Sequence, residues 1–193
     1  MLALDRARTA LLLMDFQNGI VAMFGAEGAQ CAERAAQARQ AARKAGIAVM
    51  HIRVALTAEE AAAVPAQNRI FAAAAASGRL ADHDAATQLI TQLASAPDEE
   101  VFRKRRVGAF STTQLGARLA TRAIHTLVLS GLATSGVVLS TLRDGADRDL
   151  RMLVLSDCCA DPDPDVHRVL MDKVFPRQAE VISLAEFVSA CAS

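Results

Sequence analysis

Three features of this sequence have the residue types and positions needed for chemistry on a small molecule. Asp15 ends an apolar run, Lys104 follows a second, shorter run, and the small residues of 131–136 follow a third. A strand that turns at once into a helix exposes backbone N–H groups, and these hold an anion or an oxyanion. The stretch 131–141 is therefore the expected floor of an active site.

Apolar runs alternate with helical segments along the whole chain, and these elements must position the three features. The expected strands are 9–14, 47–54, 100–103, 126–130, 151–155 and 179–182, and the expected helices are 30–44, 84–94, 113–122, 142–147, 163–173 and 184–190. Continuous rather than alternating hydrophobicity is typical of strands that are covered on both faces. The order predicts an α/β fold: a single domain, 1–193, with three layers and a doubly wound, mostly parallel six-stranded sheet.

Ligands of such sheets lie outside the carboxyl ends of the strands, where all three features fall. Asp15 also fits the simpler role of a cap or turn acceptor, and Lys104 lies in the basic cluster 103–106, which fits a solvated surface. Thr134 and Ser135 lack an obvious paired base, so capping is the favoured role for their hydroxyls. The long segment 55–79 is expected to be partly helical and to form a lid or an interface.

The composition excludes several classes of partner. The 193 residues include 21 Lys plus Arg and 21 Asp plus Glu, so no bulk charge attracts nucleic acid. Trp and Tyr are absent, which leaves few platforms for base stacking. No signal peptide or membrane span is visible, and the four cysteines lack metal-ligand spacing. We expect a cytoplasmic protein with reduced thiols, no metal and no cofactor, whose partner is a small-molecule substrate rather than nucleic acid or membrane.

Three motifs, in this order, resemble the isochorismatase-like hydrolase superfamily, also called the cysteine hydrolases. They are Met-Asp-Phe-Gln-Asn at 14–18, Lys-Arg-Arg-Val-Gly-Ala-Phe at 104–110, and Gly-Leu-Ala-Thr at 131–134 with Val138, Thr141 and Asp144. The resemblance implies the α/β fold, a homodimer or homotetramer, and a cis peptide bond that falls by position at Ala133–Thr134. Members that cleave amides use an Asp–Lys–Cys triad, in which a helix N-terminus and the ammonium activate the thiol.

The sequence departs from that pattern at the nucleophile, because Val137 stands where the family has its cysteine. The resemblance assigns catalysis to Asp15 and Lys104, and it assigns the oxyanion-binding backbone to Ala133, Thr134 and Val137. Some isochorismatases work without a thiol: a protonated Asp donates a proton to the carbon of a vinyl ether, and water attacks the resulting cation. The resemblance thus implies a hydrolase of an enol ether such as isochorismate, with Asp15 as general acid and Lys104 as its electrostatic partner.

Five further residues are expected to contact substrate, from their places near the first motifs and the second strand: Phe16, Arg53, Asn68, Phe71 and Phe110. Two alternatives stay open. The chain is a catalytically silent ligand-binding or assembly protein on the same scaffold, or it is an amidase that uses Cys158 or Cys159. The metal-binding Asp–His–His set of some nicotinamidase relatives is not visible after the second strand, so no catalytic metal is expected.

Overall fold

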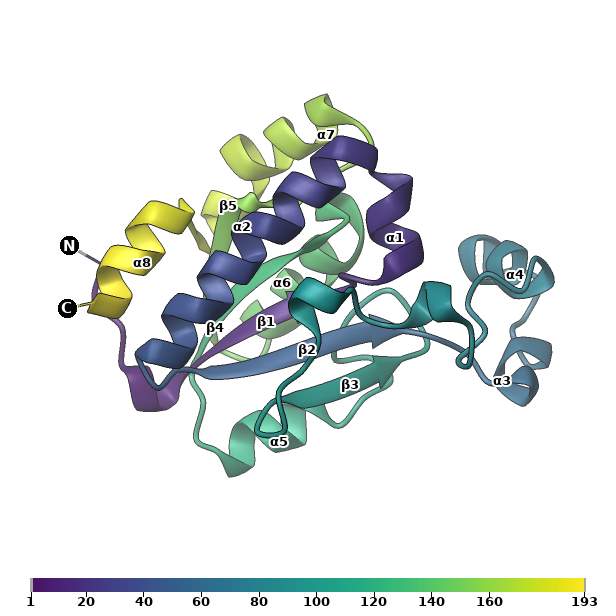
Figure 1. The fold of residues 1–193 in the computed structure, drawn as a ribbon, viewed down its shortest axis with the longest axis horizontal. Coiled ribbons are helices and arrows are strands. Elements are labelled where there is room, and N and C mark those ends of the chain that lie inside the picture. Colours follow the sequence, from purple (N-terminus) through teal and green to yellow (C-terminus); the bar gives the residue numbers. More distant parts are fainter. Residues whose placement is uncertain (1, 193) are drawn as a thin grey trace.

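A parallel six-stranded sheet forms the centre of the computed structural model, which describes residues 2–192 (Figure 1). The strands are β1 (Thr9–Met14), β2 (Ala48–Val54), β3 (Glu100–Lys104), β4 (Thr126–Leu132), β5 (Arg151–Ala160) and β6 (Glu180–Ile182). Their order is β3-β2-β1-β4-β5-β6, and every pairing is parallel. The predicted α/β class is confirmed, although β5 continues to Ala160 instead of ending at Leu155.

Helices cover both faces of this sheet. The helices of the structure are α1 (Asn18–Met23), α2 (Gly25–Lys44), α3 (Ala58–Ala62), α4 (Arg69–Ala76), α5 (Leu115–Thr121), α6 (Leu139–Ala146), α7 (Pro164–Val169) and α8 (Leu184–Ala192). Of these, α3 and α4 lie beyond the sheet and not on one of its faces. One core packs α2 and α8 against the sheet through small side chains such as Ala35 and Ala38. The other core packs α5 and α6 against the opposite face, with Phe175 completely buried.

The switch point of the sheet lies between β1 and β4, because the chain order runs outward in opposite directions from these two strands. The last residue pair between these two strands is Met14 with Gly131. A Cβ at Gly131 would lie 2.8 Å from the Met14 carbonyl oxygen, so only glycine allows the two strands to approach this closely here. Ligands of doubly wound sheets bind outside such a point.

The predicted helix 84–94 is wrong, since the structure has two short 3₁₀ turns there, Ala85–Thr87 and Thr91–Leu93. Side chains in this segment bond to nearby backbone groups. The Asp84 carboxylate accepts a hydrogen bond from Ala86 N–H, and the Thr87 hydroxyl donates to the Asp84 carbonyl. Such local bonds compete with the regular hydrogen bonds of a helix.

Residues 55–82 form an arm that carries α3 and α4 and extends from the carboxyl ends of β2 and β3 (Figure 1). A capping box starts α3: Thr57 Oγ1 accepts from Glu60 N–H, and the Glu60 carboxylate accepts from Thr57 N–H. The first and last described residues lie on the side of the molecule opposite the arm, where residues 3–7 and Ala190 line one surface hollow. Within residues 2–192, no helix is long and apolar enough to cross a membrane.

Candidate active site

Asp15 and Lys104 meet at the carboxyl end of the sheet, as predicted. Asp15 follows β1 in a left-handed conformation (φ 61°), and its N–H donates to the Ile52 carbonyl at 2.8 Å. Lys104 is the last residue of β3, two strands away, and its Nζ reaches to 2.8 Å from Asp15 Oδ2. Only 5% of Asp15 and 2% of Lys104 are exposed.

The environment of the Asp15 carboxyl makes protonation easier than it is for an ordinary aspartate. Burial raises the pKa of Asp15 above its ordinary value, and the nearby Lys104 ammonium only partly opposes this effect. Lys104 Nζ also donates to the Arg106 carbonyl at 3.3 Å. Among the described residues, Asp15 Oδ1 has no hydrogen-bond partner although it is buried. Because Oδ2 faces the Lys104 ammonium, a proton on this carboxyl is placed on Oδ1.

A cavity of about 700 Å³ opens at this pair. Asp15, Lys104, Ala133 and Val137 line its floor, and the remaining lining is largely apolar. The apolar lining residues come mainly from α1, from the arm and from the strand ends, and they are Ile20, Met23, Val54, Ile70, Phe71, Ala74, Leu80, Ala86, Val107 and Leu132. The cavity therefore places an acid and a cation beside a hydrophobic binding space at the switch point.

The turn after β4 continues into five helical residues, Thr134–Val138, with wider π-type hydrogen bonding, and then into α6. The cis peptide bond lies between Leu132 and Ala133, and not at the expected Ala133–Thr134. β4 pairs with β5 as far as Leu132, so this bond joins the last residue of the strand to the first residue of the turn.

Two contacts secure this turn from outside. Ser135 N–H donates to Asp161 Oδ2 at 2.7 Å, and Thr134 Oγ1 is bonded to Nδ1 of His167 at 2.8 Å. Thr134 is fully buried and does not line the cavity, whereas Ala133 and Val137 do. One N–H group of the predicted oxyanion-binding turn is thus already bonded to a carboxylate of the same chain.

Of the five residues expected to contact substrate, only Phe71 lines the cavity. Phe16 is buried in the core beneath α2, and Phe110 packs in the opposite core with the Arg148 guanidinium 4.6 Å from its ring centroid. Arg53 forms an ion pair with Asp82. Asn68 caps α4, because its Oδ1 accepts from Phe71 N–H.

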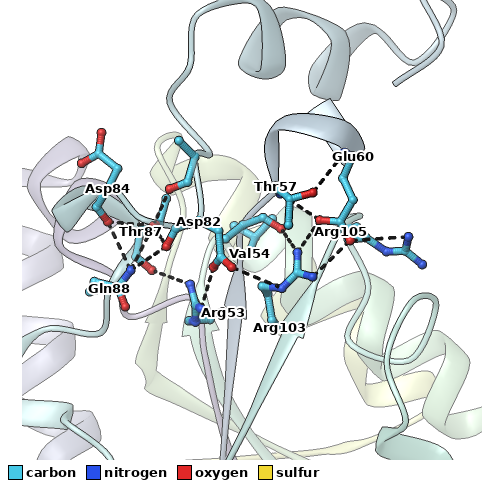
Figure 2. A network of polar contacts seen from close by, with 12 residues as sticks. Arg53, Val54, Thr57, Glu60, Asp82, Asp84, Thr87, Gln88, Arg103 and Arg105 are labelled. Carbon is cyan, nitrogen blue, oxygen red and sulfur yellow. Dashed lines mark hydrogen bonds and ion pairs between the residues drawn. The ribbon is translucent and has the colours of Figure 1, made fainter. Parts of the chain in front are cut away.

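A group of paired charges lies at the base of the arm, and Figure 2 shows it. We call it the base network and define it as Arg53, Glu60, Asp82 and Arg103. Arg53 donates to Asp82 at 2.7 Å, and Arg103 donates to Glu60 and to the Ala55 carbonyl. Arg103 also lies 3.8 Å from the second oxygen of Asp82. The network ties both ends of the arm to β2 and β3, so it fixes the wall that the arm contributes to the cavity.

Gln17 and Arg79 are cavity residues that were not predicted from the sequence. The Gln17 amide accepts from Val54 N–H and donates to the carbonyls of Val54 and Thr87, so it joins β2 to the segment after the arm. Its place two residues after Asp15 was an available signal. Arg79 lies far along the chain, and only the folding of the arm brings it to the cavity.

Cys158 and Cys159 are buried in β5 and are not part of the cavity lining. Burial raises the pKa of both thiols, and the Cys159 thiol donates to the Leu129 carbonyl at 4.0 Å. Over residues 2–192, no group of three or more His, Cys, Asp or Glu side chains is placed to hold a metal ion.

The sequence model of the isochorismatase domain family matches residues 9–186. The chain is 30% identical to the uncharacterized isochorismatase family protein YecD of Escherichia coli O157:H7, over 98% of this chain and 100% of that protein. It is 31% identical to the ureidoacrylate amidohydrolase RutB of Methylobacterium radiotolerans, over 98% of this chain and 81% of the relative.

Solved structures have the same fold. A cysteine hydrolase from Pseudomonas syringae pv. phaseolicola 1448A superposes with a TM-score of 0.91 at 24% identity, covering 100% of this chain and 96% of that one. The N-carbamoylsarcosine amidase of Thermoplasma acidophilum gives a TM-score of 0.76 at 20% identity, with 92% and 96% covered. With the family model spanning nearly the whole chain, the protein belongs to the isochorismatase family of hydrolases.

Proposed function

We propose that this isochorismatase-family hydrolase cleaves a small enol ether, such as isochorismate, by acid catalysis without a covalent thiol intermediate. Asp15 is the proton donor, and Lys104 is its electrostatic partner. The observation that carries the proposal is Asp15 Oδ1, which is buried without a hydrogen-bond partner on a carboxyl that lines the apolar cavity. Burial raises the pKa of Asp15, and a carboxylic acid with a raised pKa retains its proton for transfer to higher pH than an ordinary aspartate does.

The proposed reaction begins when Asp15 gives its proton to the terminal vinyl carbon. The electron pair of the carbon–carbon double bond forms the new C–H bond, and the positive charge is shared by the adjacent carbon and the ether oxygen. Water adds to that carbon and returns a proton to the Asp15 carboxylate. The hemiketal then collapses to a carbonyl compound and an alcohol. Lys104, 2.8 Å from Oδ2, stabilises the carboxylate formed after the first transfer.

Val137 limits the reaction mechanisms, other than acid catalysis by Asp15, that this site supports. Its side chain has no nucleophilic atom, so a thioester at residue 137 is chemically excluded. The amide hydrolysis named for the Methylobacterium relative would need another nucleophile in this chain. Cys158 and Cys159 are buried away from the cavity with raised pKa values, and they do not favour an amidase mechanism.

A second candidate function, ligand binding without turnover, is favoured by the packing of the same residue. Val137 is 2% exposed and belongs to the core that packs α6 against the sheet. The ion pair of Asp15 and Lys104 would then be a structural remnant that closes the floor of a binding cavity.

Turnover of isochorismate by the purified protein, followed by detection of the carbonyl product, tests the two candidates. We expect Asp15→Asn to lower kcat by about 10²–10⁴-fold, the usual contribution of a general acid. Asp147→Asn is the matched control, because Asp147 is exposed and lies outside the cavity lining. Equal rates for Asp15→Asn and wild type would refute the acid mechanism. Binding without turnover across a panel of enol ethers and amides would favour the second candidate.

A further inference from the structure

We propose that Arg79 is a specificity-determining residue, which binds a carboxylate of the substrate at the rim of the cavity. Four charged side chains line this cavity: Asp15, Lys104, Asp84 and Arg79. Asp15 and Lys104 pair with one another, and the Asp84 carboxylate accepts from Ala86 N–H. Arg79 forms no ion pair with any described residue, and its one hydrogen bond to a side chain is Nε to Ser77 Oγ at 2.9 Å.

The end of α4 positions this arginine. Ser77 caps the helix, and Gly78 follows in the left-handed conformation (φ 70°) that turns the chain. The Ser77 hydroxyl donates to the Ala74 carbonyl while it accepts from Arg79 Nε, so the guanidinium is tied to the helix end. This bond uses Nε and leaves the two Nη groups for a ligand. They form a planar fork that matches the two oxygens of a carboxylate.

The charge of the lining favours an anion when Asp15 is protonated. Lys104 and Arg79 then face a single carboxylate, that of Asp84. Lys104 is buried at the floor beside the reacting group, whereas Arg79 is exposed at the rim. The apolar lining, which includes Phe71 and Leu80, lies with them in the same cavity.

These positions define a substrate class, an inference that rests on the proposed function. The substrate has an acid-labile group that reaches Asp15, an apolar body, and a carboxylate that reaches Arg79. Carboxylates are held by arginine through two charge-assisted hydrogen bonds, which are about twice as strong as neutral ones. The preference for an anion should therefore depend on Arg79 more than on any exposed arginine outside the cavity.

The test uses benzoate and benzamide as probes, because they have similar size and shape but differ in charge. Dissociation constants are measured by calorimetry for wild type, Arg79→Gln, Arg79→Lys and the control Arg69→Gln. Arg69 is exposed on α4 and does not line the cavity. We expect wild type and Arg69→Gln to prefer benzoate and Arg79→Gln to lose about tenfold in benzoate affinity, with benzamide affinity unchanged. Arg79→Lys should retain part of the preference, because it keeps the charge and loses the fork.

A wild-type protein that does not prefer benzoate, or an Arg79→Gln variant that keeps the preference, would overturn the assignment. Kinetics separate this proposal from the proposed function. Arg79→Gln should raise KM for isochorismate about tenfold with little change in kcat, whereas Asp15→Asn should lower kcat and retain binding. Failure of wild type to turn over isochorismate would count against the proposed function alone, since the two probes still decide the role of Arg79.

Discussion

The two carboxylate oxygens of Asp15 have different environments: Oδ2 lies 2.8 Å from Lys104 Nζ, while Oδ1 has no partner among the described residues. The pair is held at the floor of an apolar cavity. The lysine holds one oxygen, so a proton on this carboxyl is placed on the other. Oδ1 is therefore the oxygen from which a proton would be transferred to substrate.

The rate should fall as pH rises, because only the protonated form of Asp15 is a donor. Burial raises the pKa of Asp15 above its ordinary 3.8, so the decline should lie above pH 3.8 and follow a single ionisation. The measurement is kcat/KM for isochorismate between pH 5 and pH 9. The residual rate of Asp15→Asn should lack this ionisation. A rate that increases with pH over the same range would contradict proton donation by Asp15.

Removal of the Lys104 ammonium should destabilise the fold by about 3 kcal/mol at pH 8, because it leaves a buried carboxylate without its cation. Lys104→Met is the test, with urea unfolding followed by circular dichroism. The double variant Asp15→Asn with Lys104→Met should recover much of the loss, since no buried charge remains. Wild-type stability of Lys104→Met at pH 8 would show that the pair contributes nothing.

The stability loss of Lys104→Met should also depend on pH. A folded-state pKa raised above the unfolded value means that the native state binds more protons than the unfolded state. The free energy of unfolding therefore decreases as pH rises from the unfolded to the folded pKa of Asp15. Without Lys104 that window extends to higher pH, so the variant should be closer to wild type at pH 5 than at pH 8. Asp15→Asn serves as the control, because it removes the titrating group.

A thiol placed at residue 137 should be accessible to small reagents. Val137 lines the cavity although only 2% of it is exposed, and none of the four native cysteines lines that cavity. Burial also raises the pKa of Cys31 to about 12, which slows the reaction of its thiol. We expect Val137→Cys to gain one adduct with iodoacetamide under native conditions, detected by mass spectrometry. Val137→Ala is the control, because it loosens the packing of the core without adding a thiol, and it should gain no adduct. Equal labelling of the two variants would mean that residue 137 is shielded from the cavity.

Loss of the Arg103 side chain should loosen the arm and leave the sheet intact. Arg103 joins Glu60 at the start of α3 to Asp82 at the end of the arm (Figure 2). In Arg103→Ala we expect amide hydrogen exchange over residues 56–82 to increase about tenfold, or about 1.4 kcal/mol in opening free energy. Arg118→Ala removes an exposed ion pair with Glu100 and is the matched control. An unchanged exchange pattern in Arg103→Ala would show that the base network does not hold the arm.

The sheet and the floor of the site could be predicted because their signals are local. Continuous apolar runs such as 9–14 indicate buried strands, and the residue after each strand lies at the ligand-binding edge. The walls of the cavity depend on contacts distant in sequence. Arg53 lies near the site, but its guanidinium donates to Asp82 and therefore belongs to the base network. Arg79 reaches the cavity only because the chain reverses at Gly78.

The positions of the first and last described residues would allow circular permutation to place new chain ends within the arm. Residues 3–7 and Ala190 line one hollow on the side opposite α3 and α4. A short Gly-Ser linker would therefore join the two ends without crossing the cavity. New ends opened at the exposed residues 65–67, between α3 and α4, would leave each half of the arm attached to its own strand. Each half can then be exchanged on its own while the floor of the cavity stays unchanged.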